Sequence, residues 1–333
     1  MNLLVTGGLG FIGSHFVRHA LTTKNWSVVN LDKQTYSGNP DNLRDIETNP
    51  RYRWVKGDIV EKDVVRPLMD AADVVVHFAA ETHVDRSILD PQVFLKTNVL
   101  GTHTLLEAAK ERKITRFIHV STDEVYGSVS TGESLETDAL LPNSAYAASK
   151  AASDILVRSY HQTFHLPTVI TRCSNNFGPY QYPEKALPLL ITNALEGKPF
   201  PLYGRGDNIR DWLYVEDHVK ALVTIIEKGS VGETYNIGGT CSISNRELFT
   251  LILNTMGKSP DLLQIVTDRP GHDFRYALNC DKLLCLGWKP TTSFPDALQS
   301  TIAWYSERTD WWRPIKHGKD FQQYYQHQYT QRS

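Results

Sequence analysis

Short apolar runs and amphipathic segments alternate along most of this chain. The apolar runs occupy residues 2–6, 27–31, 53–59, 74–80, 117–120, 168–171 and 234–237. Apolar residues at helical spacing follow several of these runs, after Gly13 and over residues 91–110, 146–160 and 215–227. This alternation predicts strands and helices in turn, and hence a parallel sheet covered by helices on both faces.

The local composition of the sequence changes after residue 172, where proline, glycine and aromatic residues become frequent. A chain of 333 residues is also longer than one hydrophobic core usually serves. We therefore predict an α/β fold, in which a Rossmann-type, doubly wound parallel sheet is joined by a smaller, interleaved α/β substrate-binding domain. Residues 1–172 plus about 212–239 would form the first domain, and about 173–211 plus 240–333 the second.

The composition is that of an ordinary globular protein, with 41% apolar and 22% charged residues and a net charge of −2. Neither nucleic-acid nor membrane binding is expected from it. The N-terminal strand leads straight into a glycine turn, so no secretory signal is predicted. The four cysteines have poor spacing for zinc, and we expect no metal site but free thiols in a reducing cytoplasm: Cys173, Cys241, Cys280 and Cys285.

A glycine turn follows the first predicted strand and precedes the first predicted helix. Gly7, Gly10 and Gly13 lie at intervals of three residues, and Gly8 gives a second reading of the same motif. Such a turn lets the backbone approach a pyrophosphate closely and directs a helix N-terminus at its charge. The first domain is therefore predicted to bind a dinucleotide.

An acidic residue ends the second predicted strand. Asp32 lies about 20 residues beyond the glycines, where a carboxylate accepts hydrogen bonds from the adenosine ribose hydroxyls. It would repel a 2′-phosphate and so favours NAD over NADP, although the neighbouring Lys33 weakens this preference. Asp58, after the third strand, would lie near the adenine, and the small Ala79 and Ala80 would let the backbone lie close to the cofactor.

Tyr146 and Lys150 are spaced to share one face of a predicted helix. A nearby ammonium group and a positively charged nicotinamide ring would both favour the phenolate form of Tyr146. The phenolate would then take a proton from a hydroxyl group while a hydride leaves the same carbon for NAD.

Two adjacent acids follow Thr122 at the end of the fifth predicted strand. Oxidation of an alcohol needs Tyr146 and a hydroxyl such as that of Thr122, but no pair of carboxylates. Asp123 and Glu124 suit an elimination, in which one acid removes a proton from carbon and the other protonates a departing hydroxyl group. Mutual repulsion in a partly desolvated site would keep one ionised and one protonated.

Cationic residues are scattered among the glycines and prolines of the second predicted domain. Several are expected to converge on a diphosphate, since guanidinium groups make bidentate contacts to phosphoryl oxygens. The candidates are Lys185, Arg205, Arg210, Arg269, His272 and Arg275.

These motifs resemble a known family. Gly7 to Gly13, with Tyr146 and Lys150, is similar to the extended short-chain dehydrogenase/reductases. Four longer stretches resemble the dTDP-glucose 4,6-dehydratase family more narrowly: Thr122 to Gly127, Arg172 to Lys185, Gly206 to Trp212, and Asp268 to Asp273. The resemblance covers essentially the whole chain.

The resemblance implies an enzyme, an NAD-dependent hydro-lyase that turns dTDP-D-glucose into dTDP-4-keto-6-deoxy-D-glucose. Tyr146, supported by Lys150, would deprotonate the C4 hydroxyl group as hydride passes to NAD. Glu124 would remove the C5 proton, and Asp123 would protonate the C6 hydroxyl group so that water leaves. The hydride would return to C6, so that tightly bound NAD is regenerated in each turnover.

The resemblance also implies binding residues. Thr82 and Thr122 would hold the glucosyl hydroxyl groups. The nucleotide diphosphate would contact Asn175, Lys185, Arg210, Asn245, Arg269 and His272. Leu202 and Tyr203 would line the base pocket, and Ala186 and Pro201 would also contact the substrate. The cofactor would contact Gly7, Gly10, Phe11, Ile12, Gly13, Asp32, Lys33, Thr35, Asp58, Ile59, Ala79, Ala80, Thr97, Tyr146, Lys150 and Asn176.

Three alternatives stay open at this point. UDP-glucose and GDP-mannose dehydratases share much of this machinery, so the nucleobase is undecided. A nucleotide-sugar 4-epimerase would share the fold, NAD and Tyr146, but would have no use for the Asp123–Glu124 pair. A non-catalytic NAD-sensing protein would be free to lose the tyrosine, the lysine and both carboxylates, all of which are present.

Members of this family are usually homodimers, and the resemblance implies the same assembly here. The joining helices would correspond to roughly residues 92–112 and 146–165. The apolar residues that would permit this contact are Leu105, Leu106, Ile155 and Leu156.

Overall fold

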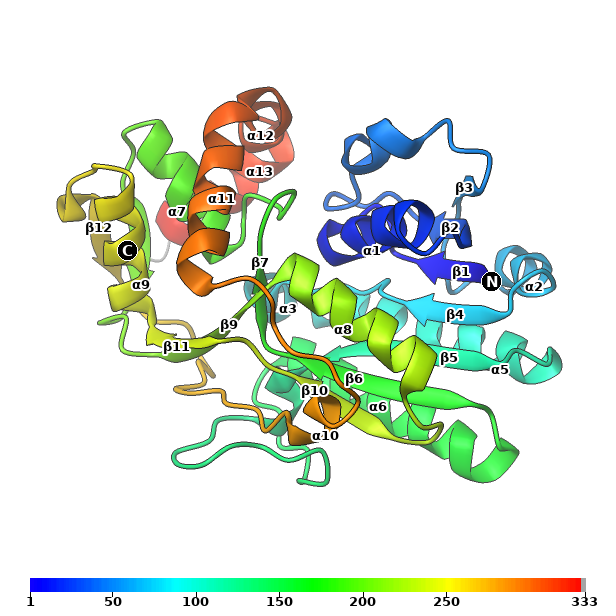
Figure 1. Cartoon of the computed structure of the whole chain (residues 1–333). Coiled ribbons are helices and arrows are strands. Elements are labelled where there is room, and N and C mark those ends of the chain that lie inside the picture. The colour runs from blue at the N-terminus through cyan, green and yellow to red at the C-terminus, as the bar shows by residue number, and fades with distance from the viewer. Residues whose placement is uncertain (331–333) are drawn as a thin grey trace.

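The structure is a computed structural model that describes residues 1–330. Its centre is a seven-stranded sheet with the order β10-β6-β5-β4-β1-β2-β3, in which every pairing is parallel (Figure 1). The predicted α/β fold with a doubly wound parallel sheet is therefore confirmed. The strands are β1 Asn2–Thr6, β2 Ser27–Asp32, β3 Tyr52–Lys56, β4 Val74–His77, β5 Arg116–Thr122, β6 Thr168–Cys173 and β10 Thr234–Ile237.

Helices cover both faces of this sheet because successive strand residues point to opposite sides. Leu3 and Val5 pack in a cluster with α1 and α8, whereas Leu4 packs on the other face with α2, α5 and α6. The helices are α1 Phe11–Thr22, α2 Lys62–Met69, α3 Val84–Leu89, α4 Pro91–Phe94, α5 Thr102–Glu111, α6 Ala145–Phe164 and α8 Val215–Lys228.

The helix predicted over residues 91–110 is present but not uniform. Its middle, Leu95–Gly101, forms a π-helical segment between α4 and α5. Inside this segment, the side-chain oxygen of Asn98 accepts from the Glu81 backbone nitrogen. The side-chain nitrogen of Asn98 donates to the Glu81 carbonyl oxygen and to the Ser149 hydroxyl group. A π-helical turn often marks a functional position, and this one ties the loop after β4 to α6.

The remaining chain forms a smaller α/β body beside the carboxyl ends of the large sheet (Figure 1). Its strands are β7 Asn175–Phe177, β8 Phe200–Tyr203, β9 Ile209–Tyr214, β11 Cys241–Ser244 and β12 Leu263–Val266, arranged as β11-β9-β7 and β12-β8. Its helices are α7 Ala186–Leu195, α9 Asn245–Thr255, α11 Phe294–Glu307, α12 Thr309–Lys316 and α13 Lys319–Tyr325, whereas α10 Asp281–Leu284 packs against β10 of the large sheet.

We propose that the chain is divided into two interleaved domains. In its favour, a separate hydrophobic cluster gathers residues between 177 and 321, and β10 returns to pair with β6. Leu283 and Trp288 fall inside the second predicted segment but pack in the cluster of α1 and α8. In this proposal, Leu283 and Trp288 therefore belong with the first domain and not with the second.

The thiols of all four cysteines are free. Among residues 1–330, no three potential metal ligands lie close enough to hold an ion. Within the same residues, no helix combines the length and the apolar character needed to cross a membrane.

Candidate active site

A cavity opens at the carboxyl ends of the parallel strands, where open α/β sheets bind their ligands. Five strands contribute a residue at or just beyond their ends: Gly7 after β1, Asp32 in β2, Ala79 after β4, Thr122 in β5 and Cys173 in β6. The sheet topology thus gathers side chains that are more than a hundred residues apart in the sequence.

The glycine turn at the floor of the cavity has no room for side chains. A Cβ atom on Gly7 would lie 2.6 Å from the backbone nitrogen of Ala79, and one on Gly13 would lie 2.3 Å from the carbonyl oxygen of Gly7. Gly7 also has a positive φ of 76°, which disfavours other residues. The turn brings the N-terminus of α1, which has no acidic residue in its first turn, to face the cavity.

Asp32 anchors this turn to the second strand. Its carboxylate accepts hydrogen bonds from the backbone nitrogens of Leu9 (2.9 Å) and Gln34 (2.8 Å). The neighbouring Lys33 does not point at Asp32 but pairs with Asp58 at 2.6 Å. Asp32 therefore stays at the cavity wall with acceptor capacity left for hydroxyl groups.

The cavity brings together all of the residues predicted to bind the cofactor. Of the residues predicted to bind the substrate, four also line it, namely Thr82, Thr122, Asn175 and Lys185. The amide oxygen of Asn175 and one carboxyl oxygen of Asp123 are buried with no hydrogen-bond partner among the described residues. Both atoms are therefore available to form a hydrogen bond with a ligand.

The two acids lie in a short 3₁₀ turn, Asp123–Tyr126, directly after β5. The Thr122 hydroxyl group caps this turn by accepting from the Glu124 backbone nitrogen, and it lies 3.2 Å from a carboxyl oxygen of Asp123. Burial, followed by the charge of Glu124, raises the pKa of Asp123 well above its usual value.

Burial also raises the pKa of Glu124, but three cations oppose the shift, first Arg269, then Arg210 and Lys185. The two acids are thus unequal: burial and the charge of Glu124 favour the protonated form of Asp123, whereas nearby cations limit the same shift in the pKa of Glu124. This inequality is what an acid and base acting on neighbouring carbons require.

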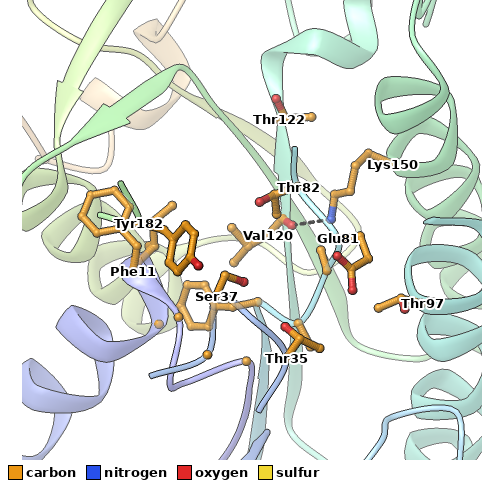
Figure 2. Close-up of a pocket in the computed structure, with 18 of the residues that line it drawn as sticks. Phe11, Thr35, Ser37, Glu81, Thr82, Thr97, Val120, Thr122, Lys150 and Tyr182 are labelled. Atoms are coloured by element: carbon orange, nitrogen blue, oxygen red, sulfur yellow. Dashed lines mark hydrogen bonds between the residues drawn. The ribbon is translucent and has the colours of Figure 1, made fainter. Parts of the chain in front are cut away.

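Tyr146 and Lys150 project from the first turns of α6 into the same cavity. The helix starts where the Ser144 side chain accepts from the Ala147 backbone nitrogen. The Lys150 ammonium group donates to the Val120 carbonyl oxygen at 2.8 Å, at the side of the cavity that also holds Thr97 (Figure 2).

The pKa values of this pair follow their burial. Burial, then the charge of Glu124, raises the pKa of Tyr146 well above its usual value, and the Thr122 hydroxyl group opposes this. The shift is opposite to the one expected for a base, so the pocket needs further positive charge before Tyr146 ionises. Burial lowers the pKa of Lys150 to about 8, with Asp154 opposing the shift.

Arg210, Arg269 and His272 do not line the cavity, but the charges of Arg210 and Arg269 act on the acids from nearby. Arg210 donates its guanidinium hydrogens to the carbonyl oxygens of Ile209 and Asp273 rather than to a carboxylate, so its charge is not neutralised locally. Arg269 pairs with Asp85 at 3.1 Å. Burial lowers the pKa of His272 to about 4, so this histidine is neutral near pH 7.

Other predicted substrate residues lie outside the cavity lining. Leu202 packs inside the C-terminal hydrophobic cluster, because its side chain points to the opposite side of β8 from that of Tyr203. Tyr203 donates to Asp85 and lies 6.1 Å from the His272 ring. Ala186, Pro201 and Asn245 are also absent from the cavity wall, and Asn245 is the first residue of α9.

Two candidate cations do not converge on the site. Arg205 is 85% exposed and pairs with Asp207, and Arg275 donates to the Gly132 carbonyl oxygen. Both residues lie among glycines and prolines, which suggested a binding role, but glycine and proline are also frequent in exposed turns.

Sequence reasoning missed several residues that line the cavity: Ser37, Gly38, Glu81, Cys173, Ser174, Gln181, Tyr182 and Glu184. Tyr182 and Glu184 lie within the long motif that ends at Lys185, so this motif was the available signal. Glu81 directly follows the two small residues after β4, which were recognised.

Comparison with known proteins agrees with this geometry. A sequence model of the family described as GDP-mannose 4,6 dehydratase matches residues 4–301. A dTDP-glucose 4,6-dehydratase of Streptomyces niveus is 48% identical over 95% of this chain and 96% of its own length. The solved dTDP-glucose 4,6-dehydratase DesIV of Streptomyces venezuelae, which has NAD bound, is 48% identical with a TM-score of 0.93, over 95% of this chain and all of that one.

A more distant structural neighbour has a different activity. The UDP-glucuronic acid 4-epimerase of Bacillus cereus is 32% identical with a TM-score of 0.87, over 92% of this chain and 99% of that one. The chain therefore belongs to the nucleotide-sugar 4,6-dehydratases, and within them to the dTDP-glucose 4,6-dehydratase family, as its motifs predicted.

Proposed function

We propose that this protein is an NAD-dependent enzyme that converts dTDP-D-glucose into dTDP-4-keto-6-deoxy-D-glucose and water. The observation that carries the proposal is the pair Asp123 and Glu124, whose pKa values are raised unequally in the same cavity as Tyr146. A 4-epimerase has no use for this acid and base. The identity to dehydratases, higher than that to the epimerase, supports the same choice.

The residues present fit NAD. The crowded glycines Gly7 and Gly13 leave only a backbone surface at the N-terminus of α1, which suits a pyrophosphate. Asp32 presents a carboxylate to ribose hydroxyl groups and would repel a 2′-phosphate. When bound, NAD supplies the acceptor, and later the donor, of a hydride.

Tyr146 begins the reaction by taking the proton of the C4 hydroxyl group, once its phenolate is favoured by Lys150 and by positive charge in the pocket. Glu124 then takes the proton from C5, which the new C4 ketone has made acidic. Asp123 gives its proton to the C6 hydroxyl group, so that the C6–O bond breaks and water leaves. Glu124 finally returns a proton to C5 as C6 receives the hydride.

Cationic side chains next to the acids would hold the diphosphate. Arg210 offers an unneutralised guanidinium group, and Lys185 lies immediately before the first turn of α7, where helix backbone nitrogens would also face the diphosphate. Lys185 donates to the Thr82 carbonyl oxygen at 2.7 Å, which connects it to a predicted sugar-binding residue.

The product formed from a mixture of substrates tests this function. We expect purified enzyme given equal amounts of dTDP-glucose and UDP-glucose to remove one water from the dTDP sugar, as seen by mass spectrometry. Loss of water from the UDP sugar alone would keep the mechanism but reject the proposed base. An unchanged mass with conversion to a galacto sugar would identify an epimerase instead.

The pH dependence of the first step follows from Lys150. Its pKa of about 8 means that the ammonium form is lost as the pH rises above that value. We therefore expect cofactor reduction in a single turnover to fall above about pH 8. Lys150→Arg should remove this fall, since a guanidinium group does not lose its proton in this range. An equally steep fall in the variant would contradict this role for Lys150.

We further propose a homodimer, formed through the helices around α5 and α6. Leu105 and Leu106 cannot make this contact, contrary to the sequence expectation, because both are buried against the chain's own sheet. Exposed apolar residues of the same helical layer take their place, with Leu95 at 55%, Leu100 at 51% and Ile155 at 59% exposure. Apolar side chains that are more than half exposed in a single chain are typical of an interface.

Charge introduced into this surface should separate the subunits. We expect the double variant Leu100→Lys, Ile155→Lys to have the mass of a monomer by light scattering, whereas the unchanged protein has the mass of a dimer. A matched pair of changes at the exposed Leu251 and Ile265, on the other body of the molecule, should leave the dimer intact. A dimer that survives the first pair would reject this interface.

We also propose that the enzyme acts in the cytoplasm. The free thiols and the absence of a membrane-spanning helix within residues 1–330 are consistent with this location.

A further inference from the structure

Two loops line the same part of the cavity from opposite bodies of the molecule. The loop of residues 33–38 follows β2 of the large sheet, and the loop of residues 181–185 leads into α7. Figure 2 shows Tyr182 and Ser37, one from each loop, on the side of the cavity away from Lys150. A dinucleotide held on the glycine turn would lie between these loops and the sheet.

Tyr36 connects the two loops directly. Its hydroxyl group donates to a carboxyl oxygen of Glu184 at 2.7 Å. Its ring also packs edge to face with the ring of Tyr182, at 5.3 Å between centroids. The opening between the loops is therefore bridged by a hydrogen bond and by an aromatic contact.

Arg86 binds the other oxygen of the Glu184 carboxylate. Its Nε donates to the second carboxyl oxygen of Glu184 at 2.9 Å. The guanidinium group lies between two aromatic rings, 4.1 Å from the centroid of Tyr36 and 4.2 Å from that of Tyr324 in α13. The side chain of Glu184 is only 1% exposed, so both of its oxygens are used inside the protein.

We propose that Tyr36, Arg86 and Glu184 form a latch that keeps the two loops together across the cavity and so retains NAD between turnovers. This inference rests on the proposed binding of NAD. Release of the cofactor requires the loops to part, and parting them breaks the bond from Tyr36 to a buried, charged acceptor. Retention matters to the proposed reaction, because the hydride taken from C4 must return to C6 of the same sugar.

Two of the three latch residues, Tyr36 and Arg86, lie outside the cavity lining, and Glu184 is the latch residue that lines it. Asp32, the glycine turn and the ends of the strands make most of the cofactor surface. The contribution of the latch residues is therefore expected in the rate of cofactor release rather than in the chemical steps.

The exchange of bound cofactor tests the latch. Holoenzyme is mixed with an excess of isotopically labelled NAD, and the labelled fraction that remains bound is followed by rapid gel filtration and mass spectrometry. We expect Tyr36→Phe to exchange its cofactor roughly tenfold to a hundredfold faster, as loss of a hydrogen bond to a charged group predicts. Glu184→Gln, which keeps the shape but removes the charge, should exchange at least as fast.

Tyr160→Phe is the matched control. The Tyr160 hydroxyl group also donates to a carboxylate, that of Glu107, but between α5 and α6 and away from the cavity. Exchange at the unchanged rate in Tyr36→Phe, or equal acceleration in both tyrosine variants, would overturn the latch. Unchanged protein that is purified without NAD and does not take it up would overturn the proposed function and the latch with it.

Discussion

Tyr146→Phe is expected to lower the rate of C4 oxidation by about a hundredfold to ten-thousandfold, the usual contribution of a positioned acid or base. The substitution removes one oxygen and keeps the ring, which packs against Phe94 at 6.3 Å between centroids. The fold and the cofactor cavity should therefore persist. Single-turnover absorbance, which reports reduction of the bound cofactor, measures this step directly.

The variant separates oxidation from the later steps. If Tyr146→Phe reduces the bound cofactor at the unchanged rate but releases product slowly, Tyr146 acts after C4 oxidation and its proposed role is wrong. Retention of NAD by the variant, measured by mass spectrometry, is the control for an intact cavity.

Glu124→Gln should have an effect of similar size on a different step. The amide keeps the shape of the side chain but cannot take the C5 proton, so we expect product formation to fall by about a hundredfold to ten-thousandfold. Oxidation at C4 should continue, and the variant should therefore accumulate reduced cofactor with substrate bound. Exchange of the C5 hydrogen with deuterated water measures the blocked step.

Asp123→Asn is the matched comparison, since it changes the neighbouring acid in the same way. Because its raised pKa favours Asp123 as the proposed proton donor, its amide variant should still exchange the C5 hydrogen but should not release water. If Glu124→Gln exchanges this hydrogen and Asp123→Asn does not, the acid and the base have been assigned in the wrong order.

The fold could be predicted because its signals are local. Short apolar runs mark the strands of the large sheet, and parallel strands place their carboxyl ends at one edge. Gly7, Asp32, Ala79 and Thr122 therefore had to meet, whatever the details of the packing. The same reasoning brought Tyr146 and Lys150 to the cavity through their spacing on one helix.

The latch could not be predicted, because it depends on contacts between distant segments. Tyr36, Arg86, Glu184 and Tyr324 lie in four separate parts of the sequence, and no spacing rule relates them. Leu105 shows the related limit of a periodic pattern. An apolar stripe predicts that a helix face is covered, but the stripe alone does not say whether the cover is its own sheet or a second subunit.

The unequal behaviour of the two acids also needed the structure. Their adjacency in the sequence indicated an acid and a base, but not which was which. Only the folded chain places the cations Arg269, Arg210 and Lys185 around Glu124. The direction of the difference then follows from charge and burial.

In the proposed reaction, one site oxidises C4, removes water and returns the same hydride to C6. The most direct test is to supply dTDP-glucose that carries deuterium at C4 in ordinary water and to locate the label in the product. We expect a product that has lost one water and carries the deuterium at C6. Loss of the label to solvent, or its recovery at C4, would contradict the proposed reaction.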